Sequence, residues 1–244
     1  MTSFAKSIAA ERPEEIALRD PRQALTWLDV DNVLNRAANA IRLAETGPDL
    51  RIAVFAENGV ETALANLGGL IGGASVVPIN FHLTAEEVAY ILSDSGARMV
   101  FLGPETAERG LEAATLAGID QIIGWRCEIA GLQSWSEWLA ASSSEEPDTS
   151  IPPRPNLLYT SGTTGRPKGT HLPPTMFAGG DTVEAHLQNL KLNPLAALGP
   201  HLVVGPMYHT GPLSGARLLA AGAPSVILTK FDPENTLKTI AEYK

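Results

Sequence analysis

The sequence predicts an α/β fold in which parallel βαβ units are followed by a glycine- and threonine-rich loop. Short apolar runs alternate with amphipathic segments between residues 51 and 123. This alternation indicates parallel strands joined by right-handed crossover helices. A further apolar run, residues 156–159, leads directly into the segment YTSGTTGRPKGT, and a second strand–helix alternation follows it. We therefore expect two α/β portions, residues 1–155 and 156–244.

The N-terminal part predicts a β-hairpin and a long helix. The turn-forming tetrapeptide at 20–23 separates the apolar runs 15–19 and 24–27, as expected for two antiparallel strands. Thr26 precedes Asp29 by three residues, which is the spacing of a capping box. Apolar residues then recur at helical spacing until a Gly-Pro pair ends the helix.

The central part predicts strands and helices in strict alternation. Asn58 is expected to cap the first of these helices, and Thr84 with Glu87 has the pattern of a full capping box for the second. Gly68 and Gly69 are small enough to let the first helix pack closely on a sheet. The strands are expected at residues 51–55, 74–79, 98–102 and 119–123, and the helices at 60–71, 85–96 and 107–117.

Residues 124–155 interrupt this alternation. Ser134 and Glu137 have capping-box spacing. Trp135 and Trp138 are three residues apart, so they share one helix face, which we expect to pack against the sheet. Beyond the loop, helices are expected at 175–190, 213–221 and 235–243, and strands at 201–205 and 225–228. Asp232 is expected to cap the last helix, with Pro233 at the first helical position.

The segment from Tyr159 to Thr170 holds three glycines, four threonines, one serine and one lysine. Glycines let backbone N–H groups approach an anion, hydroxyl groups add neutral donors, and a lysine adds a positive charge. This composition predicts a phosphate-binding loop. The alternative is a flexible linker, but the preceding strand and Pro167 would hold the loop in place.

A Walker P-loop is the next alternative. That motif has the form G-x-x-x-x-G-K-S/T, with the lysine directly after a glycine and a hydroxyl residue directly after the lysine. Here Lys168 follows Pro167 and precedes Gly169, so the match fails at both neighbours. A kinase or NTPase of the Walker type is therefore disfavoured.

Composition excludes several other classes. The net charge of −9 argues against nucleic acid as the main partner. The one cysteine, Cys127, cannot form an intrachain disulfide and is interpreted as a structural thiol. The N-terminus has no signal-peptide pattern and no window is long and apolar enough to span a membrane. We expect a cytoplasmic protein.

The loop resembles the phosphate-loop signature of the adenylate-forming superfamily, which includes the acyl-CoA synthetases. The family form is close to Y/F-T-S-G-S/T-T-G-x-P-K-G, and Tyr159 to Gly169 matches it at every position. The resemblance extends from about Ile16 to Lys244. It is carried by the TWLD run at 26–29, the region 69–94, the PMYH run at 206–209, Gly222 and the FDPE run at 231–234.

The resemblance implies two half-reactions that use ATP, magnesium and coenzyme A. A carboxylate attacks the α-phosphate of ATP, which yields an acyl-adenylate and pyrophosphate, and a thiol then takes the acyl group. Positive charge and hydrogen-bond donors in the loop would stabilise the leaving pyrophosphate. No magnesium ligand is assigned. The residues expected to bind the phosphates are Thr160, Ser161, Gly162, Thr163, Thr164, Gly165 and Lys168.

His209 is the second candidate, and we expect it and Lys168 to be the catalytic residues. It follows a predicted strand, at the edge where open α/β sheets bind ligands. The resemblance places the matching histidine beside the adenylate and the acid substrate, whereas a histidine taken alone is more often structural. The MYHTGPL run, residues 207–213, looks like that of fatty-acyl members, so a fatty acid is the expected substrate. His82 stands where the family often has arginine.

Segments that follow in the family are absent before Lys244. They comprise a G-Y-G-x-T/S-E segment, an aspartate that contacts ribose, a hinge and a small C-terminal domain. We therefore expect an N-terminal piece that is inactive alone and that self-associates through exposed sheet edges. The alternative is a non-catalytic remnant that binds a nucleotide or a protein.

Overall fold

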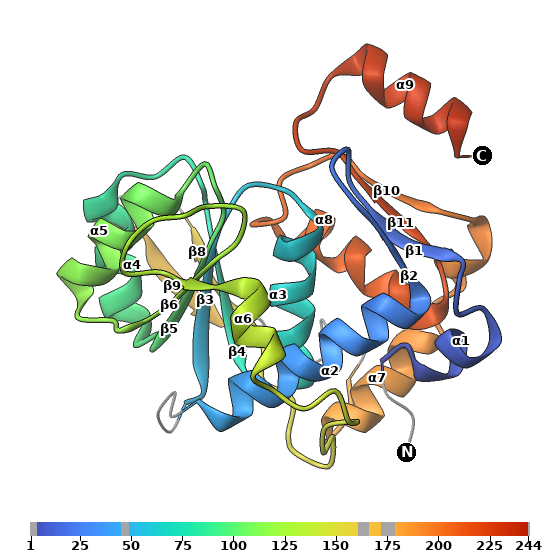
Figure 1. Ribbon diagram of the computed structural model, residues 1–244, viewed down its shortest axis with the longest axis horizontal. Helices are drawn as coiled ribbons and strands as arrows, with labels where there is room; N and C mark the ends of the chain where they lie inside the picture. Colours follow the sequence, from blue (N-terminus) through green and yellow to red (C-terminus); the bar gives the residue numbers. More distant parts are fainter. Residues whose placement is uncertain (1–3, 45–48, 161–165, 172–178, 244) are drawn as a thin grey trace.

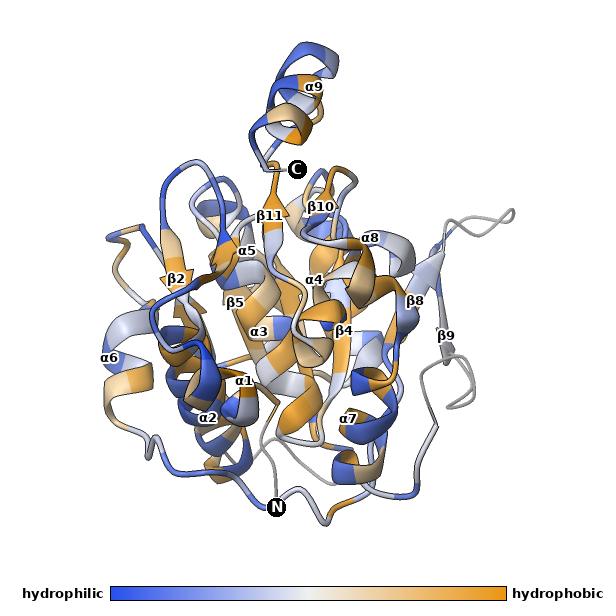
Figure 2. Cartoon of the chain, turned by 90° about the vertical axis from the view of Figure 1, so that its right-hand side faces the viewer, coloured by the Kyte–Doolittle hydropathy of each residue, from blue (hydrophilic) through white to orange (hydrophobic). Residues whose placement is uncertain are grey.

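The computed structural model describes residues 4–44, 49–160, 166–171 and 179–243. Helices pack on two mainly parallel sheets, and helix α9, Pro233–Glu242, stands apart from them at the C-terminal end (Figure 1). Apolar residues concentrate in the strands and on the inner helix faces (Figure 2). The α/β architecture expected from the sequence is confirmed.

The larger sheet has the strand order β4-β3-β5-β6-β7, and all of its pairs are parallel. Four of its strands were predicted, and the short edge strand β7 was not. The strands are β3 (Arg51–Phe55), β4 (Ser75–Ile79), β5 (Met99–Leu102), β6 (Gln121–Gly124) and β7 (Gln133–Ser134). The helices between and after them are α3 (Val60–Ile71), α4 (Ala85–Ser95), α5 (Ala107–Ala117) and α6 (Trp135–Ala140).

The second sheet joins the two ends of the chain. Its order is β10-β11-β1-β2, with the predicted hairpin β1–β2 at one edge. Leu18 of β1 lies opposite Ser225 of β11 in parallel register, so this sheet crosses the boundary expected at residue 155. The strands are β1 (Ile16–Arg19), β2 (Ala24–Thr26), β10 (His201–Val203) and β11 (Ser225–Ile227). The helices of these parts are α1 (Lys6–Glu11), α2 (Trp27–Leu43), α7 (Val183–Lys191), η2 (Pro194–Leu198), α8 (Thr210–Ala216) and η3 (Arg217–Ala221).

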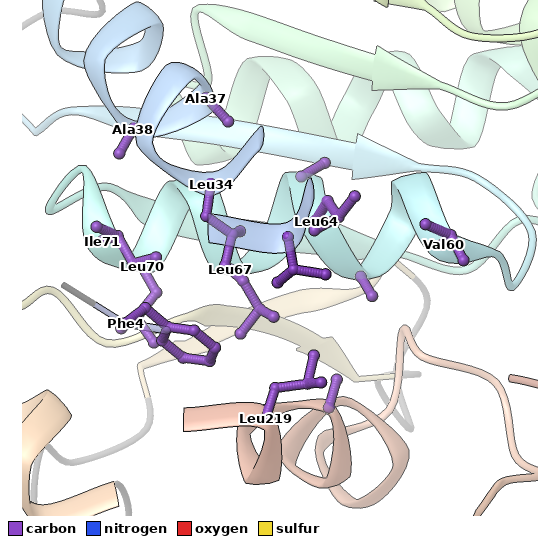
Figure 3. Close-up of a cluster of buried hydrophobic side chains, with 14 of the residues drawn as sticks. Phe4, Leu34, Ala37, Ala38, Val60, Leu64, Leu67, Leu70, Ile71 and Leu219 are labelled. Atoms are coloured by element: carbon purple, nitrogen blue, oxygen red, sulfur yellow. The ribbon is translucent and has the colours of Figure 1, made fainter. Parts of the chain in front are cut away.

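Helix α3 is buried along its whole length between the larger sheet, α2 and η3 (Figure 3). A Cβ on Gly69 would meet Val76 Cγ2 at 2.6 Å and Ile52 Cδ1 at 2.7 Å, so this glycine lies against the sheet as expected. Gly68 has a different neighbour: a Cβ there would meet Ala37 Cβ of α2 at 2.7 Å. The glycine pair therefore lets α3 approach two layers at once.

Two of the predicted capping boxes are confirmed and one is wrong. Thr26 caps α2 with Asp29, and Thr84 caps α4 with Glu87. Ser134 makes no cap hydrogen bond; its hydroxyl lies 2.8 Å from that of Ser136. The aspartate cap at the start of α9 is confirmed.

The predicted cap of α3 by Asn58 is also wrong. Gly59 occupies the N-cap position, and the Val60 N–H donates to Asp20 Oδ2 at 3.1 Å. A carboxylate from the β1–β2 turn thus takes the place expected for the neighbouring amide. The Asn58 side chain is directed elsewhere, as described below.

The expectations for the two tryptophans and for the helix after the loop had different outcomes. The ring centroids of Trp135 and Trp138 are 5.3 Å apart in a stacked arrangement, and both rings meet Phe101 of β5 edge-on, which confirms the shared face. Of the helix expected at 175–190, residues 175–178 lie outside the described residues. Helix α7 begins at Val183, since Gly180 has a φ of +111° and Thr182 is the N-cap. Among the described residues, no helix is long and apolar enough to cross a membrane.

Candidate functional site

The predicted phosphate loop is carried by an antiparallel hairpin. Strands β8 (Leu157–Thr160) and β9 (Lys168–His171) pair in register, with Thr160 directly opposite Lys168. Both residues are exposed. The candidates from Ser161 to Gly165 lie outside the described residues. The second strand of the hairpin was not predicted, and it brings Lys168 back beside the residue where the loop begins.

Helix α4 holds this hairpin through side chains one turn apart. The Tyr90 hydroxyl donates to the Pro167 carbonyl oxygen at 3.2 Å, and the Arg166 guanidinium lies 5.0 Å from the centre of the Tyr90 ring. The Tyr159 hydroxyl donates to Asp94 Oδ2 at 2.6 Å. Burial and the Asp94 carboxylate raise the pKa of Tyr159, so its hydroxyl remains a donor at neutral pH.

The base of the hairpin is tied to the edge of the larger sheet beside β4 (Figure 2). Leu157 is buried in the same apolar cluster as residues of β3, β4 and α4. Just before it, the Ser75 hydroxyl donates to the Pro155 carbonyl oxygen at 2.8 Å, and Arg154 donates to the Gly73 carbonyl oxygen at 2.7 Å. The strand that leads into the loop is thus anchored at the edge of the larger sheet.

His209 lies at the N-cap of α8 rather than at the end of a strand, because β10 already ends at Val203. It is exposed, and its backbone N–H donates to the Pro206 carbonyl oxygen at 3.0 Å. Its ring lies 4.4 Å from the ring of Tyr208, which in turn meets Phe81 edge-on at 5.7 Å. Phe81 precedes α4, so the β4–α4 unit contacts both the His209 segment and the hairpin that carries Lys168.

A pocket of 350 Å³ opens near this segment, at the carboxyl edge of the parallel strands. This is the edge at which open α/β sheets bind ligands. The residues that line it are Asn58, Phe81, His82, Glu105, Val204, Pro206, Thr229, Lys230 and Phe231. The motifs did not point to most of these residues, because they follow different strands and meet only in the fold.

A buried carboxylate lies next to the pocket. Glu57 is adjacent to Asn58, and burial raises its pKa. We find no set of side chains that would hold the expected magnesium ion. Within the part of the chain that the structure describes, no group of three or more histidine, cysteine or acidic side chains is arranged to bind a metal ion. We therefore assign no step to magnesium.

Comparison with known proteins identifies relatives of this chain. The family model described as AMP-binding enzyme matches residues 5–244. The long-chain-fatty-acid–CoA ligase FadD13 of Mycobacterium tuberculosis is 30% identical over 228 residues, which cover 89% of this chain and 42% of that protein. The feruloyl-CoA synthase of an Amycolatopsis species is 31% identical over 237 residues, covering 94% of this chain and 44% of that protein. The chain thus spans less than half the length of either ligase.

Solved structures agree with this assignment. The inhibitor-bound N-terminal domain of FACL13 from M. tuberculosis superposes with a TM-score of 0.75 at 25% identity, over 99% of this chain and 61% of that one. The o-succinylbenzoate coenzyme A synthetase MenE of Bacillus subtilis, in complex with AMP, has the same fold with a TM-score of 0.72 at 22% identity, over 100% of this chain and 47% of that one. With the loop signature intact on its hairpin and the family model matched from residue 5 to residue 244, the chain belongs to the AMP-binding, adenylate-forming enzymes.

Proposed function

We propose that this chain forms the phosphate-binding and acid-facing part of a ligase that uses ATP to join a carboxylic acid to coenzyme A. The observation that carries the proposal is the complete loop signature between Thr160 and Lys168, at the open end of a hairpin that α4 holds in place. The proposal extends to the fatty-acid, ATP and coenzyme A partners expected from the sequence.

In the proposed first half-reaction, a carboxylate oxygen of the acid bonds to the α-phosphorus of ATP. The bond between that phosphorus and the oxygen bridging to the β-phosphate breaks, and the electron pair leaves with pyrophosphate. Lys168 and the loop donors from Thr160 to Gly165 would offset the negative charge that develops there. His209 would orient the acid from the N-terminus of α8.

In the proposed second half-reaction, the thiol of coenzyme A attacks the acyl carbon and AMP leaves. The acid is proposed to be a fatty acid, on the basis of the MYHTGPL run at 207–213. Similarity to FadD13 supports a fatty acid, while similarity to feruloyl-CoA synthase supports an aryl acid. A panel of fatty, aryl and amino acids in an acid-dependent ATP–pyrophosphate exchange assay would separate them, and strict dependence on an amino acid would overturn the choice.

Replacing Lys168 by alanine is expected to weaken pyrophosphate binding by roughly 1.5–3 kcal/mol, or about 10- to 150-fold, the range for a hydrogen bond to a charged group. Titration calorimetry with pyrophosphate and with ATP would measure the change. Lys238→Ala is the matched control, since this lysine is an exposed residue of α9 that pairs with Glu234 of the same helix at 2.7 Å. Unchanged affinity in Lys168→Ala would remove that residue from the site.

The alternative, a protein that binds a nucleotide without catalysis, predicts a different pair of results. ATP would bind with an affinity that depends on Lys168, yet no acid would support exchange of pyrophosphate into ATP. Exchange that requires an acid favours the ligase. Hydrolysis of ATP in the absence of every acid would instead favour an NTPase.

A further inference from the structure

We propose that Asn58 is the positioning residue of the His209 segment. Its side-chain amide would hold the backbone from Gly205 to Met207 and so determine where His209 stands at the start of α8. The part of this proposal that concerns ligand binding rests on the proposed function. The part that concerns the placement of His209 does not.

The Asn58 amide uses all of its polar groups on this segment and its neighbour. Its Oδ1 accepts the Met207 N–H at 2.8 Å, and its Nδ2 donates to the carbonyl oxygens of Gly205 at 2.8 Å and Leu228 at 3.2 Å. The residue is only 5% exposed. A buried amide whose donors and acceptor are all paired holds its partners in one arrangement, because breaking any bond leaves a buried polar group unpaired.

These contacts join the two sheets. Asn58 follows β3 of the larger sheet, whereas Gly205 and Leu228 follow β10 and β11 of the other. The held segment is also confined from the other side. A Cβ on Gly205 would meet Pro212 Cγ at 2.8 Å, so its backbone packs directly on the first turn of α8. The turn that contains His209 is therefore held between Asn58 and α8.

The same residue lines the pocket at the carboxyl edge, together with Phe81 and Pro206. The hairpin that carries Lys168 is held by other side chains, Tyr90 and Asp94 of α4. The side chains that hydrogen-bond to the two halves of the proposed site are thus different, although Phe81 of the β4–α4 unit also meets Tyr208. Loss of the Asn58 contacts should displace His209 and the acid side of the site, and should leave the phosphate side in place.

The test compares Asn58→Ala and Asn58→Asp with Asn66→Ala. Asn66 is a matched control, since it is a buried asparagine of α3 whose amide donates within its own helix, to the Thr62 carbonyl oxygen at 2.8 Å. Asn58→Asp keeps the side-chain volume and the hydrogen-bond acceptor, but it turns a carboxylate oxygen toward two carbonyl groups. It therefore tests the same contacts if the alanine variant does not fold.

The first readout is NMR of the 244-residue chain without ligand. In Asn58→Ala, the Met207 amide is expected to exchange about tenfold faster or more, and the His209 ring signals are expected to shift. Asn66→Ala should change neither signal. Unchanged Met207 exchange together with unchanged His209 signals in folded Asn58 variants would overturn the proposal.

The second readout is the affinity for two probes, pyrophosphate and dodecanoyl sulfamoyl-adenosine, an unreactive mimic of an acyl-adenylate. Both Asn58 variants are expected to bind the acyl probe about tenfold more weakly, with pyrophosphate affinity unchanged. An equal loss for both probes would reveal a general structural defect and would contradict the proposal. If the wild-type chain binds neither probe, the proposed function fails and the NMR result alone decides the placement of His209 by Asn58.

Discussion

Replacing Arg126 by methionine is expected to lower the free energy of unfolding by about 3–5 kcal/mol at pH 7, the usual cost of breaking a buried ion pair. Arg126 follows β6, and its guanidinium binds both carboxylate oxygens of Glu61, at 2.8 and 2.7 Å. It also reaches Asp20 Oδ2 at 3.3 Å. The side chains of Glu61 and Asp20 are 9% and 0% exposed, so the variant leaves two buried carboxylates without their cation.

The cost of this substitution should depend on pH. Burial raises the pKa of Glu61. Burial also opposes ionisation of Asp20, but the N–H groups of Val60, Arg22 and Gln23, with Arg126, lower its pKa on balance. The stability that Asp20 contributes is therefore present above its unfolded pKa and is lost as the pH falls through its folded pKa. For Glu61 the charged form is the unfavourable one, and protonation stabilises the folded state.

Without Arg126, both folded pKa values move upward, so the variant gains more than the wild type from protonation as the pH falls. The difference in unfolding free energy should accordingly shrink between pH 7 and pH 5. Urea unfolding followed by tryptophan fluorescence would measure it at both values. Arg98→Met, at an exposed arginine, should stay within about 0.5 kcal/mol of the wild type. A difference that is the same at both pH values would contradict the explanation.

Replacing Leu67 by alanine is expected to cost about 2–5 kcal/mol of stability, the range for a buried leucine that leaves a cavity. Leu67 is 1% exposed on the fully buried helix α3. Figure 3 shows it among leucines of the same helix, with Leu34 of α2 on one side and Leu219 of η3 on the other. The cluster therefore joins the N-terminal and C-terminal parts of the chain in one core.

Because this core spans the boundary expected at residue 155, Leu67→Ala should lower the unfolding midpoint of the whole chain in a single transition. Thermal unfolding followed by circular dichroism, together with urea titration, would measure the change. Leu116→Ala removes the same atoms from a side chain of α5 that is 61% exposed, and should change the stability by no more than about 0.5 kcal/mol. Two separate transitions in the variant would contradict a shared core.

The local elements could be predicted where the information lies within a few residues. The Thr84–Glu87 capping box and the left-handed Gly96 fixed both ends of α4 as expected. The predictions failed where a distant group competed for the same hydrogen bond. Asn58 is a common helix-capping residue, but the Val60 N–H donates to the Asp20 carboxylate. The Asn58 side-chain amide therefore bonds to Gly205 and Met207 instead.

In the candidate site, too, the local features could be predicted from the sequence and the long-range contacts could not. The identity of the loop from Thr160 to Lys168 could be predicted, since the residue types and their order specify its chemistry. Its support by Tyr90 and Asp94 could not, because those residues lie on a helix more than 60 residues earlier. Likewise, the motif singled out His209, while its place at the start of α8, rather than at a strand end, depends on where β10 stops.

By itself, the sequence determined the α/β class, most of the strands and helices, and the family to which the loop signature belongs. These features follow from hydrophobic period, capping residues and turn residues, which act over short distances along the chain. Only the tertiary structure decided that β1 pairs with β11, that α3 is buried between the larger sheet, α2 and η3, and that Asn58 and α4 contact the two sides of the proposed site. Those features depend on which buried polar groups and apolar faces meet after folding. Residues far apart in the chain compete for these contacts, and local sequence patterns do not encode the outcome.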